Sequence, residues 1–293
     1  MKVLVLGGSG MLGHQLCARL SEETETWASF RTRDDRLLEL AWYRRVSPIF
    51  GVEAGDLRSV ETALDTAAPD VVLNAIGIVK QRDESKDAIP AILVNALFPH
   101  ELAGLTRAKG IGLVHVSTDC VFSGLRGMYT EADVPDPTDL YGRTKLLGEV
   151  LYPGCLTLRT SIVGWELRGR KSLLEWFAAH REGRIKGYRR AIYTGLSSRA
   201  LAELIADLLL TRKDLSGLYH VASAPISKYE ILHGLADRLG WKSVTIEPSD
   251  QFRCDRSLLG ARFEAATGWQ APSWEEMLDA LSLEWLGYSQ LRR

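Results

Sequence analysis

The chain has 293 residues, of which 46% are hydrophobic and 25% are charged, and its 36 basic and 37 acidic side chains leave a net charge of −1. This length allows one large or two modest domains, and the composition excludes a disordered, collagen-like or disulfide-rich protein. Nucleic-acid-binding proteins usually carry a basic excess, which this chain lacks, so we expect no nucleic-acid partner.

The first half of the chain alternates short apolar runs with stretches of helical periodicity. Strands are predicted at residues 3–6, 26–30, 71–74, 113–117 and 156–161, and helices at residues 11–20, 92–108 and 141–151. Strands that alternate with helices indicate βαβ units and a parallel sheet. The predicted fold class is therefore α/β, with a doubly wound parallel sheet.

The second half of the chain has a different sequence pattern. Helical patterns occur at residues 173–183, 199–210, 228–239 and 274–285, and six of the eight tryptophans follow Val163. We interpret these tryptophans as packing residues of a small helical subdomain rather than as platforms for a flat ligand. A basic cluster precedes Tyr193 and consists of Arg184, Lys186, Arg189 and Arg190. It either neutralises a ligand diphosphate or forms a solvated charged loop, and the sequence leaves both readings open.

A glycine-rich segment follows the first predicted strand and opens the first predicted helix; it reads Gly7-Gly8-Ser9-Gly10-Met11-Leu12-Gly13. Gly7 allows the tight turn, Gly10 lets the backbone approach a pyrophosphate, and Gly13 lets the helix pack closely on the sheet. The helix N-terminus adds free N–H groups and a partial positive charge. The segment therefore predicts a dinucleotide site.

The residues after the second predicted strand bear on the choice of nicotinamide cofactor. An acidic side chain there would bind the ribose 2′-hydroxyl of NAD, whereas an arginine would suit the 2′-phosphate of NADP. Arg31 follows the strand directly, and the first acid comes only at Asp34. The sequence therefore favours NADP(H), and the alternative is that Arg31 is a solvated loop charge.

Tyr141 and Lys145 stand four residues apart on one face of a predicted helix. A phenol titrates near 10 in water, and a neighbouring ammonium lowers that pKa, so that the tyrosine can exchange a proton with a carbonyl or alcohol oxygen. Thr118 lies at the carboxyl end of a predicted strand, where doubly wound folds place their active sites. Its hydroxyl could hydrogen-bond the same substrate oxygen.

Together these motifs resemble the extended short-chain dehydrogenase/reductase family, and within it the dTDP-4-dehydrorhamnose reductases. The resemblance covers nearly the whole chain, is strong to about Ser161 and is weaker after it. It is carried by the glycine motif, Asp56-Leu57, Asn74-Ala75, Asn95, Ser117-Thr118-Asp119, Tyr141 to Glu149, Arg159-Thr160-Ser161 and Gly217-Leu218-Tyr219-His220.

The resemblance implies a Rossmann domain at residues 1–161 and a smaller C-terminal α/β substrate domain at residues 162–293, with part of 191–212 returning to the first. It also implies NADPH-dependent reduction of a nucleotide-diphosphate sugar, a 4-keto-6-deoxy sugar, in deoxysugar and cell-surface polysaccharide biosynthesis. Thr118 would orient the keto oxygen, Tyr141 would protonate it, and Lys145 would tune Tyr141 and hold the nicotinamide ribose.

The cofactor-binding residues implied in this way come from several segments. They are Gly7, Ser9, Gly10, Met11, Leu12, Gly13, Arg31, Asp56, Leu57, Asn74, Ala75, Ile76, Gly77, Asn95, Tyr141 and Lys145. NADPH is the expected cofactor and NAD is less favoured. A homodimer stays open, because the glutamate that helps bind magnesium at some family dimer interfaces is not evident near Gln15.

The sequence departs from the family pattern where the sugar is expected. Cys120 replaces the family's tyrosine after Ser-Thr-Asp, and the run from Ile76 to Gln81 differs from the usual one. Two alternatives therefore stay open: a nucleotide-sugar epimerase or dehydratase on the same fold, and a noncatalytic cofactor-binding regulatory subunit such as the methionine adenosyltransferase beta subunit. A dehydratase is less favoured because Cys120 stands after Asp119.

The cysteines and apolar runs bear on the cellular location. Four widely spaced cysteines form no C-x-x-C pair, so we expect no zinc site and no disulfide framework. No apolar run approaches the roughly 20 residues that span a bilayer. We therefore expect a cytoplasmic protein with no membrane segment and no bound metal.

Overall fold

The computed structural model describes residues 1–81, 83–212 and 214–291. It is built around a seven-stranded sheet in which every neighbouring pair of strands is parallel. Across the sheet the order is β10 (Gly217–His220), β6 (Cys155–Thr160), β5 (Gly112–Thr118), β4 (Val71–Asn74), β1 (Lys2–Leu6), β2 (Glu25–Phe30) and β3 (Val46–Phe50).

The strand order reverses direction beside β1. From β1 the chain proceeds outward to β2 and β3, and it then crosses back to β4 on the other side of β1. In open parallel sheets, ligands bind at the carboxyl ends of the strands beside such a switch point. The predicted α/β class with a doubly wound parallel sheet is confirmed.

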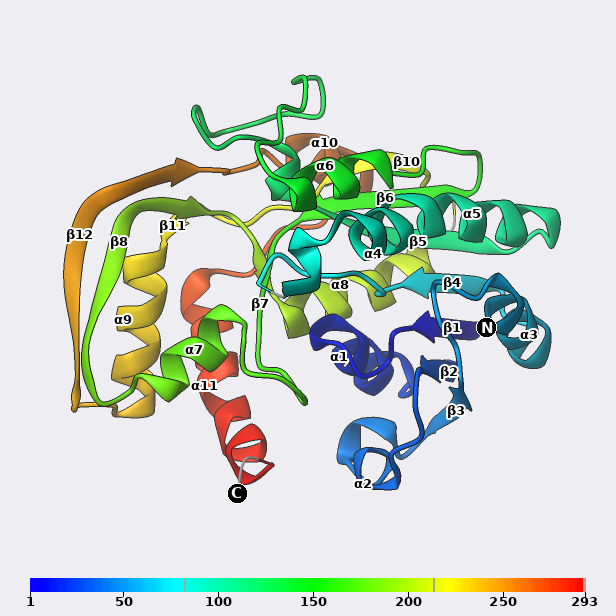
Figure 1. Ribbon diagram of the computed structural model, residues 1–293, viewed down its shortest axis with the longest axis horizontal. Helices are drawn as coiled ribbons and strands as arrows, with labels where there is room; N and C mark the ends of the chain where they lie inside the picture. The colour runs from blue at the N-terminus through cyan, green and yellow to red at the C-terminus, as the bar shows by residue number, and fades with distance from the viewer. Residues whose placement is uncertain (82, 213, 292–293) are drawn as a thin grey trace.

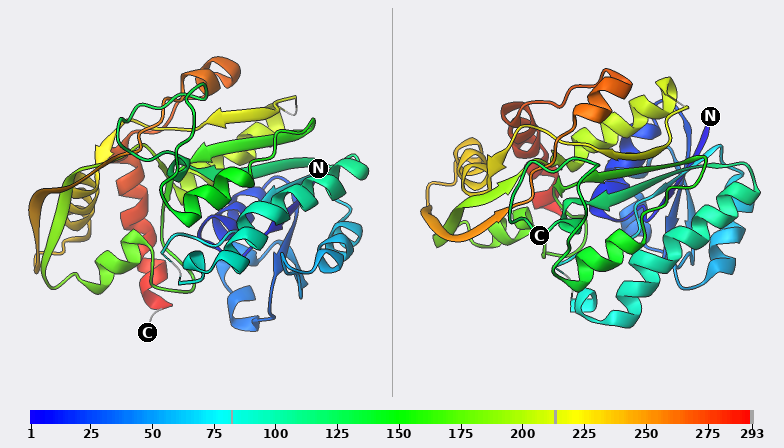
Figure 2. Two further views of the ribbon diagram at one scale, coloured as in Figure 1. Left: turned by 45° about the horizontal axis from the view of Figure 1, so that its top comes forward. Right: turned by 90° about the horizontal axis from the view of Figure 1, so that it is seen from above.

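Helices cover both faces of this sheet, as the ribbon views show (Figures 1 and 2). Val3 and Val5 point into the core shared with α1 and α8, whereas Leu4 and Leu6 point into the core shared with α3 and α5. This alternation is the period-two pattern of a strand buried on both faces. The elements of this part are α1 (Met11–Leu20), α2 (Asp35–Leu38), η1 (Ala41–Tyr43), α3 (Leu57–Ala67), η2 (Asp83–Lys86), α4 (Ala88–Ile92), η3 (Leu93–Leu97), α5 (Phe98–Ala108), η4 (Asp119–Val121), α6 (Leu140–Leu147) and α8 (Ser198–Thr211).

The second half of the chain contributes a separate three-stranded sheet, seen at the left of Figure 1. Its central strand β8 (Gly183–Tyr193) pairs parallel with β12 (Val244–Asp255) and antiparallel with β11 (Ile226–Ser227). The remaining elements are β7 (Ile162–Val163), β9 (Leu196–Ser197), α7 (Leu173–Ala179), α9 (Lys228–Leu239), α10 (Ala261–Thr267) and α11 (Trp274–Gln290).

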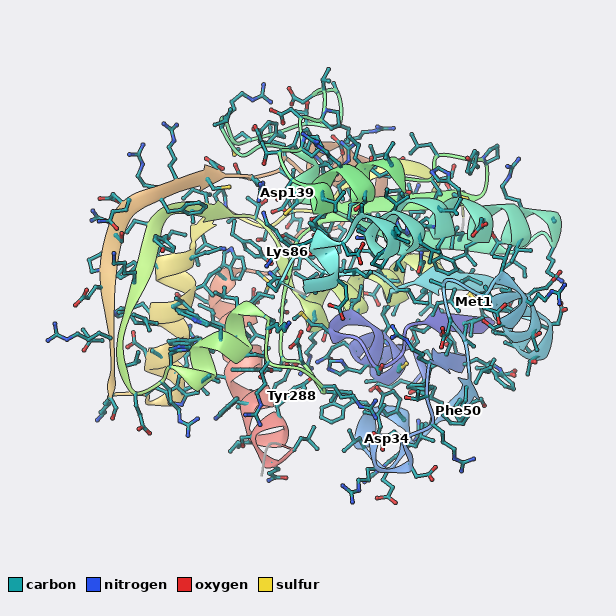
Figure 3. The ribbon with its side chains drawn as sticks, in the orientation of Figure 1. Met1, Asp34, Phe50, Lys86, Asp139 and Tyr288 are labelled. Atoms are coloured by element: carbon teal, nitrogen blue, oxygen red, sulfur yellow. The ribbon has the colours of Figure 1, made fainter. Side chains whose placement is uncertain are left out.

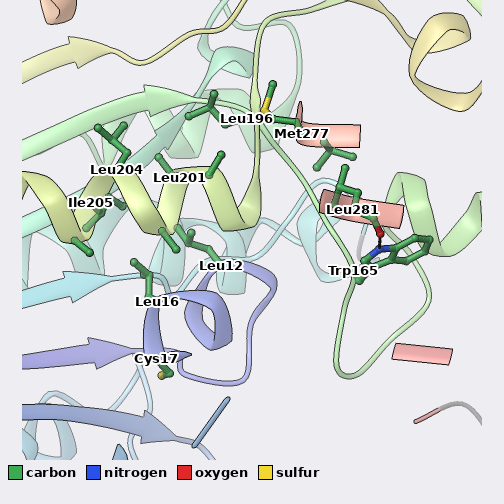
Figure 4. Close-up of a cluster of buried hydrophobic side chains, with 14 of the residues drawn as sticks. Leu12, Leu16, Cys17, Trp165, Leu196, Leu201, Leu204, Ile205, Met277 and Leu281 are labelled. Atoms are coloured by element: carbon green, nitrogen blue, oxygen red, sulfur yellow. Dashed lines mark hydrogen bonds between the residues drawn. The ribbon is translucent and has the colours of Figure 1, made fainter. Parts of the chain in front are cut away.

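Two segments of the second half return to the large sheet. Helix α8 packs on α1 through Leu201, Leu204 and Ile205, which meet Leu12 and Leu16 in one apolar cluster (Figure 4). Strand β10 adds the edge strand beside β6. The two residue ranges proposed as domains stay a prediction, because the buried core runs continuously from α1 through α8 to α11.

The structure also corrects several predicted elements. The helix predicted at 141–151 ends at Leu147 with Gly148 as its C-cap, and a Cβ on Gly148 would lie 1.9 Å from the Asn95 carbonyl oxygen, so this position requires glycine. The helix predicted at 173–183 ends at Ala179, and Gly183 begins β8. The sequence did not predict β3, α3, β8 or β12, so the second half is less helical than expected.

One apolar helical run bears on the membrane prediction. Among the described residues, the run Ala88–Ala108 is long and apolar enough to cross a membrane by length and composition alone. Its Phe98 and Leu102 are fully buried in the core beneath the large sheet. A core helix of a soluble protein passes the same test, and the cytoplasmic location stays a prediction.

Candidate active site

The glycine segment forms the turn between β1 and α1. Gly7 has a φ of +87°, and a Cβ on Gly13 would lie 2.1 Å from the Gly7 carbonyl oxygen, so both positions require glycine. Gly10 is the N-cap of α1, and a Cβ there would lie 3.3 Å from the same oxygen. The turn therefore leaves a cradle free of side chains at a helix N-terminus, which fits the pyrophosphate of a dinucleotide.

The segment after β2 carries the residues expected near the adenosine ribose. Arg31 is exposed directly after the strand. Asp34 is the N-cap of α2, where its carboxylate accepts hydrogen bonds from the Arg36 and Leu37 N–H groups, and it also forms an ion pair with Arg168. The nearest acid is thus occupied by helix capping and by a cation, and the exposed arginine is left at this edge.

The loop after β4 lies against the glycine turn. The Asn74 Oδ1 atom accepts a hydrogen bond from the Ile76 N–H at 3.1 Å, and a Cβ on Gly7 would lie 3.1 Å from Ile76. Asn95 in η3 holds the far side of this loop, since its amide bonds the N–H and the carbonyl of Ile78 at 2.9 and 3.0 Å. Both asparagines are buried and shape the loop.

Further predicted residues lie on the same side of the sheet. Asp56 caps α3 by accepting hydrogen bonds from the Arg58 and Ser59 N–H groups, and Leu57 begins that helix. Helix capping accounts for the position of the Asp56 carboxylate without a ligand. These bonds alone therefore indicate no contact of Asp56 or Leu57 with a cofactor.

The three predicted catalytic residues meet at the carboxyl end of β5. Thr118 is the last residue of β5, and its side chain lies near enough to the Tyr141 phenol on α6 to lower the pKa of that phenol. One turn further along α6, the Lys145 Nζ donates a hydrogen bond to the Val116 carbonyl at 2.7 Å. A Cβ on Gly142 would lie 2.2 Å from the Cys120 carbonyl oxygen, so glycine lets α6 approach this close.

Burial governs the protonation of this group. It raises the pKa of the Tyr141 phenol, with a further contribution from Cys120, and only the Thr118 hydrogen bond acts in the other direction. It lowers the pKa of Lys145 to about 8, against the opposing charge of Glu149. The raised tyrosine pKa is opposite to the direction expected from the Tyr–Lys pair, because removal of the phenol from water is the largest cause of the shift.

A buried polar network supports the end of β5 from below. Glu149 forms a two-point ion pair with Arg159, with both contacts at 2.7 Å, and accepts the Ser117 hydroxyl at 2.6 Å. Arg159 also contacts His220 at 3.3 Å. His220 and His115 are both buried, and His115 bonds Asn74 at 3.2 Å, so both histidines take part in packing beneath the site.

Two basic residues, Arg256 and Lys80, lie beside the predicted catalytic residues, although the motif analysis did not assign them to the site. Arg256, just after β12, donates from Nε to the Phe122 carbonyl at 2.8 Å and from Nη1 to the Cys120 thiol at 3.5 Å. Lys80 pairs with Asp139 at 2.6 Å, and Asp139 caps α6. The sequence signals were weak: Arg256 lies in a loosely family-like segment, and Lys80 lies in a run unlike the family's.

Asp119 and Cys120 complete this edge. Burial raises the pKa of Asp119, although Arg256 opposes the shift. Burial and Asp119 together raise the pKa of the Cys120 thiol to about 12. Cys120 is therefore a neutral thiol at physiological pH, which suits a packing residue rather than a nucleophile.

The basic cluster of the second half lies on β8, in the smaller sheet. Across the β8–β12 pair, Arg184 meets Glu247 at 3.3 Å and Arg189 forms an ion pair with Asp250. Lys186 donates to the Gln251 side chain at 3.0 Å. Three of the four cations are thus paired across an exposed sheet, which favours the solvated reading over a diphosphate site.

No metal centre can be built from the part of the chain that the structure describes, since no group of three or more His, Cys, Asp or Glu side chains is placed to hold an ion. Near the start of α1, the Gln15 amide donates hydrogen bonds to Tyr288 at 3.0 Å and to Glu284 at 3.4 Å. Burial raises the pKa of Glu284 to about 7, so this position is not a cluster of charged carboxylates.

Comparison with known proteins gives one family over almost the whole chain. A family model described as the RmlD substrate binding domain matches residues 1–284. A probable low-salt glycan biosynthesis reductase, Agl14 of Haloferax volcanii, is 27% identical over 99% of this chain and 100% of its own length. A dTDP-4-dehydrorhamnose reductase of Burkholderia thailandensis is 30% identical over 83% of this chain and 80% of its own. A methionine adenosyltransferase 2 subunit beta of Danio rerio is 27% identical over 84% and 76%.

Solved structures share the fold. A dTDP-4-dehydrorhamnose reductase from Bacillus anthracis in complex with NADP superimposes with a TM-score of 0.78 at 23% identity, covering 97% of this chain and 100% of that one. The Bordetella bronchiseptica enzyme WbmG in complex with NAD gives a TM-score of 0.77 at 20% identity, covering 99% and 95%. At these identities the likeness shows the fold alone.

Proposed function

Because the chain belongs to the RmlD substrate-binding domain family, we propose that it reduces the keto group of a nucleotide-linked 4-keto-6-deoxy sugar with NADPH. Since the chain belongs to this family and its relatives include reductases, it is an NAD(P)-dependent oxidoreductase of the nucleotide-sugar class. The observation that carries the proposal is that Thr118 at the end of β5 and Tyr141 on α6 come together, with Lys145 one helical turn further along α6.

The proposed roles follow from donor chemistry. Reduction of a ketone adds a hydride to carbon and a proton to oxygen, and a bound nicotinamide supplies the hydride. Tyr141, whose raised pKa keeps it protonated at neutral pH, donates the proton to the carbonyl oxygen. Thr118 holds that oxygen in place through its hydroxyl, and the Lys145 ammonium favours the phenolate that remains.

NADPH is proposed over NADH because of the residues after β2. An exposed arginine suits the 2′-phosphate of NADP, and the Asp34 carboxylate that would suit the NAD ribose is already bonded to the start of α2 and to Arg168. The structures with a similar fold hold NADP in one case and NAD in the other. The preference of this chain therefore rests on Arg31 and Asp34.

The sugar is proposed to lie between the catalytic residues and the segment that carries Arg256. Cys120 removes the hydroxyl that the family's tyrosine would offer there, and the Arg256 guanidinium stands next to the Cys120 thiol as a replacement donor. Lys80 adds a second cation at the same edge. A sugar ring with acceptor oxygens near its keto carbon fits this arrangement of donors.

One alternative function has a specific observation in its favour. The methionine adenosyltransferase 2 beta subunit of Danio rerio matches most of this chain at 27% identity. A noncatalytic subunit would keep the dinucleotide site without needing a proton donor. The complete set of Thr118, Tyr141 and Lys145 favours the reductase instead.

The experiment that tests the proposal follows the loss of NADPH absorbance with dTDP-, UDP- and GDP-linked 4-keto-6-deoxy sugars. We expect oxidation that depends on one nucleotide sugar, and a Tyr141→Phe variant that loses about 10²- to 10⁴-fold in kcat while still binding NADPH. Tyr152→Phe serves as the matched control, since Tyr152 is exposed and bonds only His100 among its described partners.

Two results would count against the reductase. Full activity in the Tyr141→Phe variant would show that another group donates the proton. NADPH binding without oxidation by any of the sugars would favour the noncatalytic subunit, and the next search would then be for a protein partner.

A further inference from the structure

The C-terminal helix α11 reaches the glycine turn at the opposite end of the chain. Figure 3 labels its Tyr288 between α11 and the helices of the first half. The Tyr288 hydroxyl forms a hydrogen bond with the His14 Nε2 atom, and the His14 Nδ1 atom bonds the Gly10 carbonyl at 2.7 Å. A relay of side chains therefore joins the last turn of α11 to the N-cap of α1.

The direction of each hydrogen bond in this relay is determined. A carbonyl can only accept, so His14 carries its proton on Nδ1 and its Nε2 atom is an acceptor. Tyr288 must then donate its O–H to Nε2, and the Tyr288 oxygen accepts from the Gln15 amide at 3.0 Å. Burial lowers the pKa of His14 to about 4, so the ring stays neutral at physiological pH.

The relay is shielded from water. His14, Gln15 and Tyr288 are all buried, with Tyr288 only 1% exposed. Trp42 packs edge-on against His14 with ring centroids 5.7 Å apart and tilts over Tyr288 at 5.2 Å. Since water cannot replace a lost partner in such a place, loss of any link leaves an unsatisfied atom.

The end point of the relay is the part of α1 that would bind a pyrophosphate. The Gly10 carbonyl accepts the backbone N–H of His14 at 3.1 Å as well as its ring N–H. These two hydrogen bonds to one carbonyl oxygen fix the first turn of α1, whose N–H groups face the expected cofactor. The orientation of the glycine turn thus depends on a residue 274 positions away in sequence.

We propose that Tyr288, acting through His14, is a positioning residue for the dinucleotide, so that the C-terminal helix sets the affinity of the glycine turn for NADPH. This inference rests on the proposed function, because it assumes that the turn binds a nicotinamide dinucleotide. Neither residue contacts the reacting atoms, and the sugar lies at the opposite side of the proposed site. The effect should therefore fall on cofactor affinity and leave the chemical step unchanged.

The test measures NADPH binding by the full-length Tyr288→Phe variant. Without the Tyr288 hydroxyl, the Nε2 lone pair of neutral His14 and the Gln15 amide both lose their partner in a site closed to water, so the ring is no longer held against the Gly10 carbonyl from that side. The turn then spends less time in its binding geometry, and we expect the Kd for NADPH to rise about 5- to 20-fold. The KM for the nucleotide sugar and kcat at saturating NADPH should stay within about twofold of the wild-type values.

The matched control is a substitution that removes a hydrogen bond at the opposite end of α11. The Trp274 indole N–H donates to the Ala224 carbonyl at 2.7 Å, far from the glycine turn. Trp274→Phe should lower the Tm as Tyr288→Phe does but leave the Kd for NADPH unchanged. The ¹⁵N signals of His14 give a second readout, since both proteins should show the Nδ1–H tautomer and the Nε2 signal should shift when its Tyr288 donor is removed.

Three results would overturn the proposal. The first is an unchanged Kd for NADPH in Tyr288→Phe, and the second is an equal loss of affinity in Trp274→Phe. If Tyr288→Phe does not fold, His14→Gln breaks the same link, and an unchanged Kd in that variant is the third. Failure of the wild-type chain to bind any nicotinamide dinucleotide would overturn the proposed function together with this inference.

Discussion

The charge state of Lys145 gives the proposed site a pH dependence. Burial lowers the pKa of Lys145 to about 8, so its ammonium is charged below that pH and is lost as the pH rises through it. Tyr141 stays protonated over the same range because its pKa is raised. We therefore expect kcat/KM for reduction to be flat from about pH 6 and to fall above about pH 8.

A pH–rate profile with saturating NADPH checks this expectation. Lys145→Arg keeps a positive charge at all these pH values, so its activity should be lower but its profile should lack the fall near pH 8. A wild-type profile that stays flat to about pH 10 would show that the reaction does not depend on the charge of Lys145.

Arg31 provides the second prediction at the scale of single residues. If its guanidinium binds the 2′-phosphate of NADPH, Arg31→Asp should weaken NADPH binding about 10- to 100-fold and improve NADH binding, because the new carboxylate suits a ribose hydroxyl. The ratio of the two kcat/KM values measures the shift. Arg33→Gln is the matched control, since Arg33 is already paired with Asp35 at 2.8 Å. An unchanged ratio in Arg31→Asp would remove the basis for the NADPH preference.

The sequence predicted the residues of the site better than their environment. Thr118, Tyr141 and Lys145 come together as expected because each follows from a local motif on a predicted element. The raised pKa of Tyr141 and the positions of Arg256 and Lys80 were not predictable in this way. They depend on burial and on contacts between different segments of the chain, which periodicity and spacing do not encode.

At the scale of elements, the β1–α1 turn depends on a very close backbone approach at Gly13. A Cβ on Gly13 would lie 2.1 Å from the Gly7 carbonyl oxygen, and backbone atoms on both sides prevent relief. Gly13→Ala should therefore lower the Tm and abolish measurable NADPH binding. Gly104 on α5 has no atom within 4 Å of its own added Cβ and is exposed. Gly104→Ala should raise the stability by up to about 1 kcal/mol, because alanine is the better helix former.

Thermal unfolding of the two variants, followed by circular dichroism, checks this contrast. If Gly13→Ala melts at the wild-type temperature and binds NADPH normally, the turn must differ from the one described here. If both variants lose stability equally, the effect would belong to helix packing in general rather than to the close approach at Gly7.

The elements that sequence reasoning missed share a physical cause. Strand β8 carries its charged residues on a sheet that is exposed on one side, so Arg184 and Lys186 alternate with Ile185 in place of a continuous apolar run. Strand β3 contains Pro48 and lies at the edge of the large sheet, where proline is tolerated. By contrast, β1, β4 and β5 are covered on both faces and each contains an uninterrupted apolar run of two or more residues, which made them easy to predict.

At the scale of the whole molecule, the two halves of the chain share one core. The apolar cluster that contains Leu12 of α1 also contains Leu201 of α8 and Leu281 of α11 (Figure 4), and Phe177 of α7 belongs to the same cluster. The Trp165 indole N–H donates to the Leu281 carbonyl at 2.8 Å within it. We expect the full chain to unfold in a single transition when it is monitored by tryptophan fluorescence and by circular dichroism.

A fragment that ends at Ser161, the predicted domain boundary, should therefore not fold by itself. It would lack β10, which pairs with β6, and α8, which buries Leu12 and Leu16 of α1. The uncovered edge and the apolar face of the sheet would favour aggregation over a soluble dinucleotide-binding unit. Analytical gel filtration and NADPH binding of residues 1–161 measure this. A soluble monomer that binds NADPH would show that the first half carries its own stability, and that α8 and β10 only cover a sheet that is already formed.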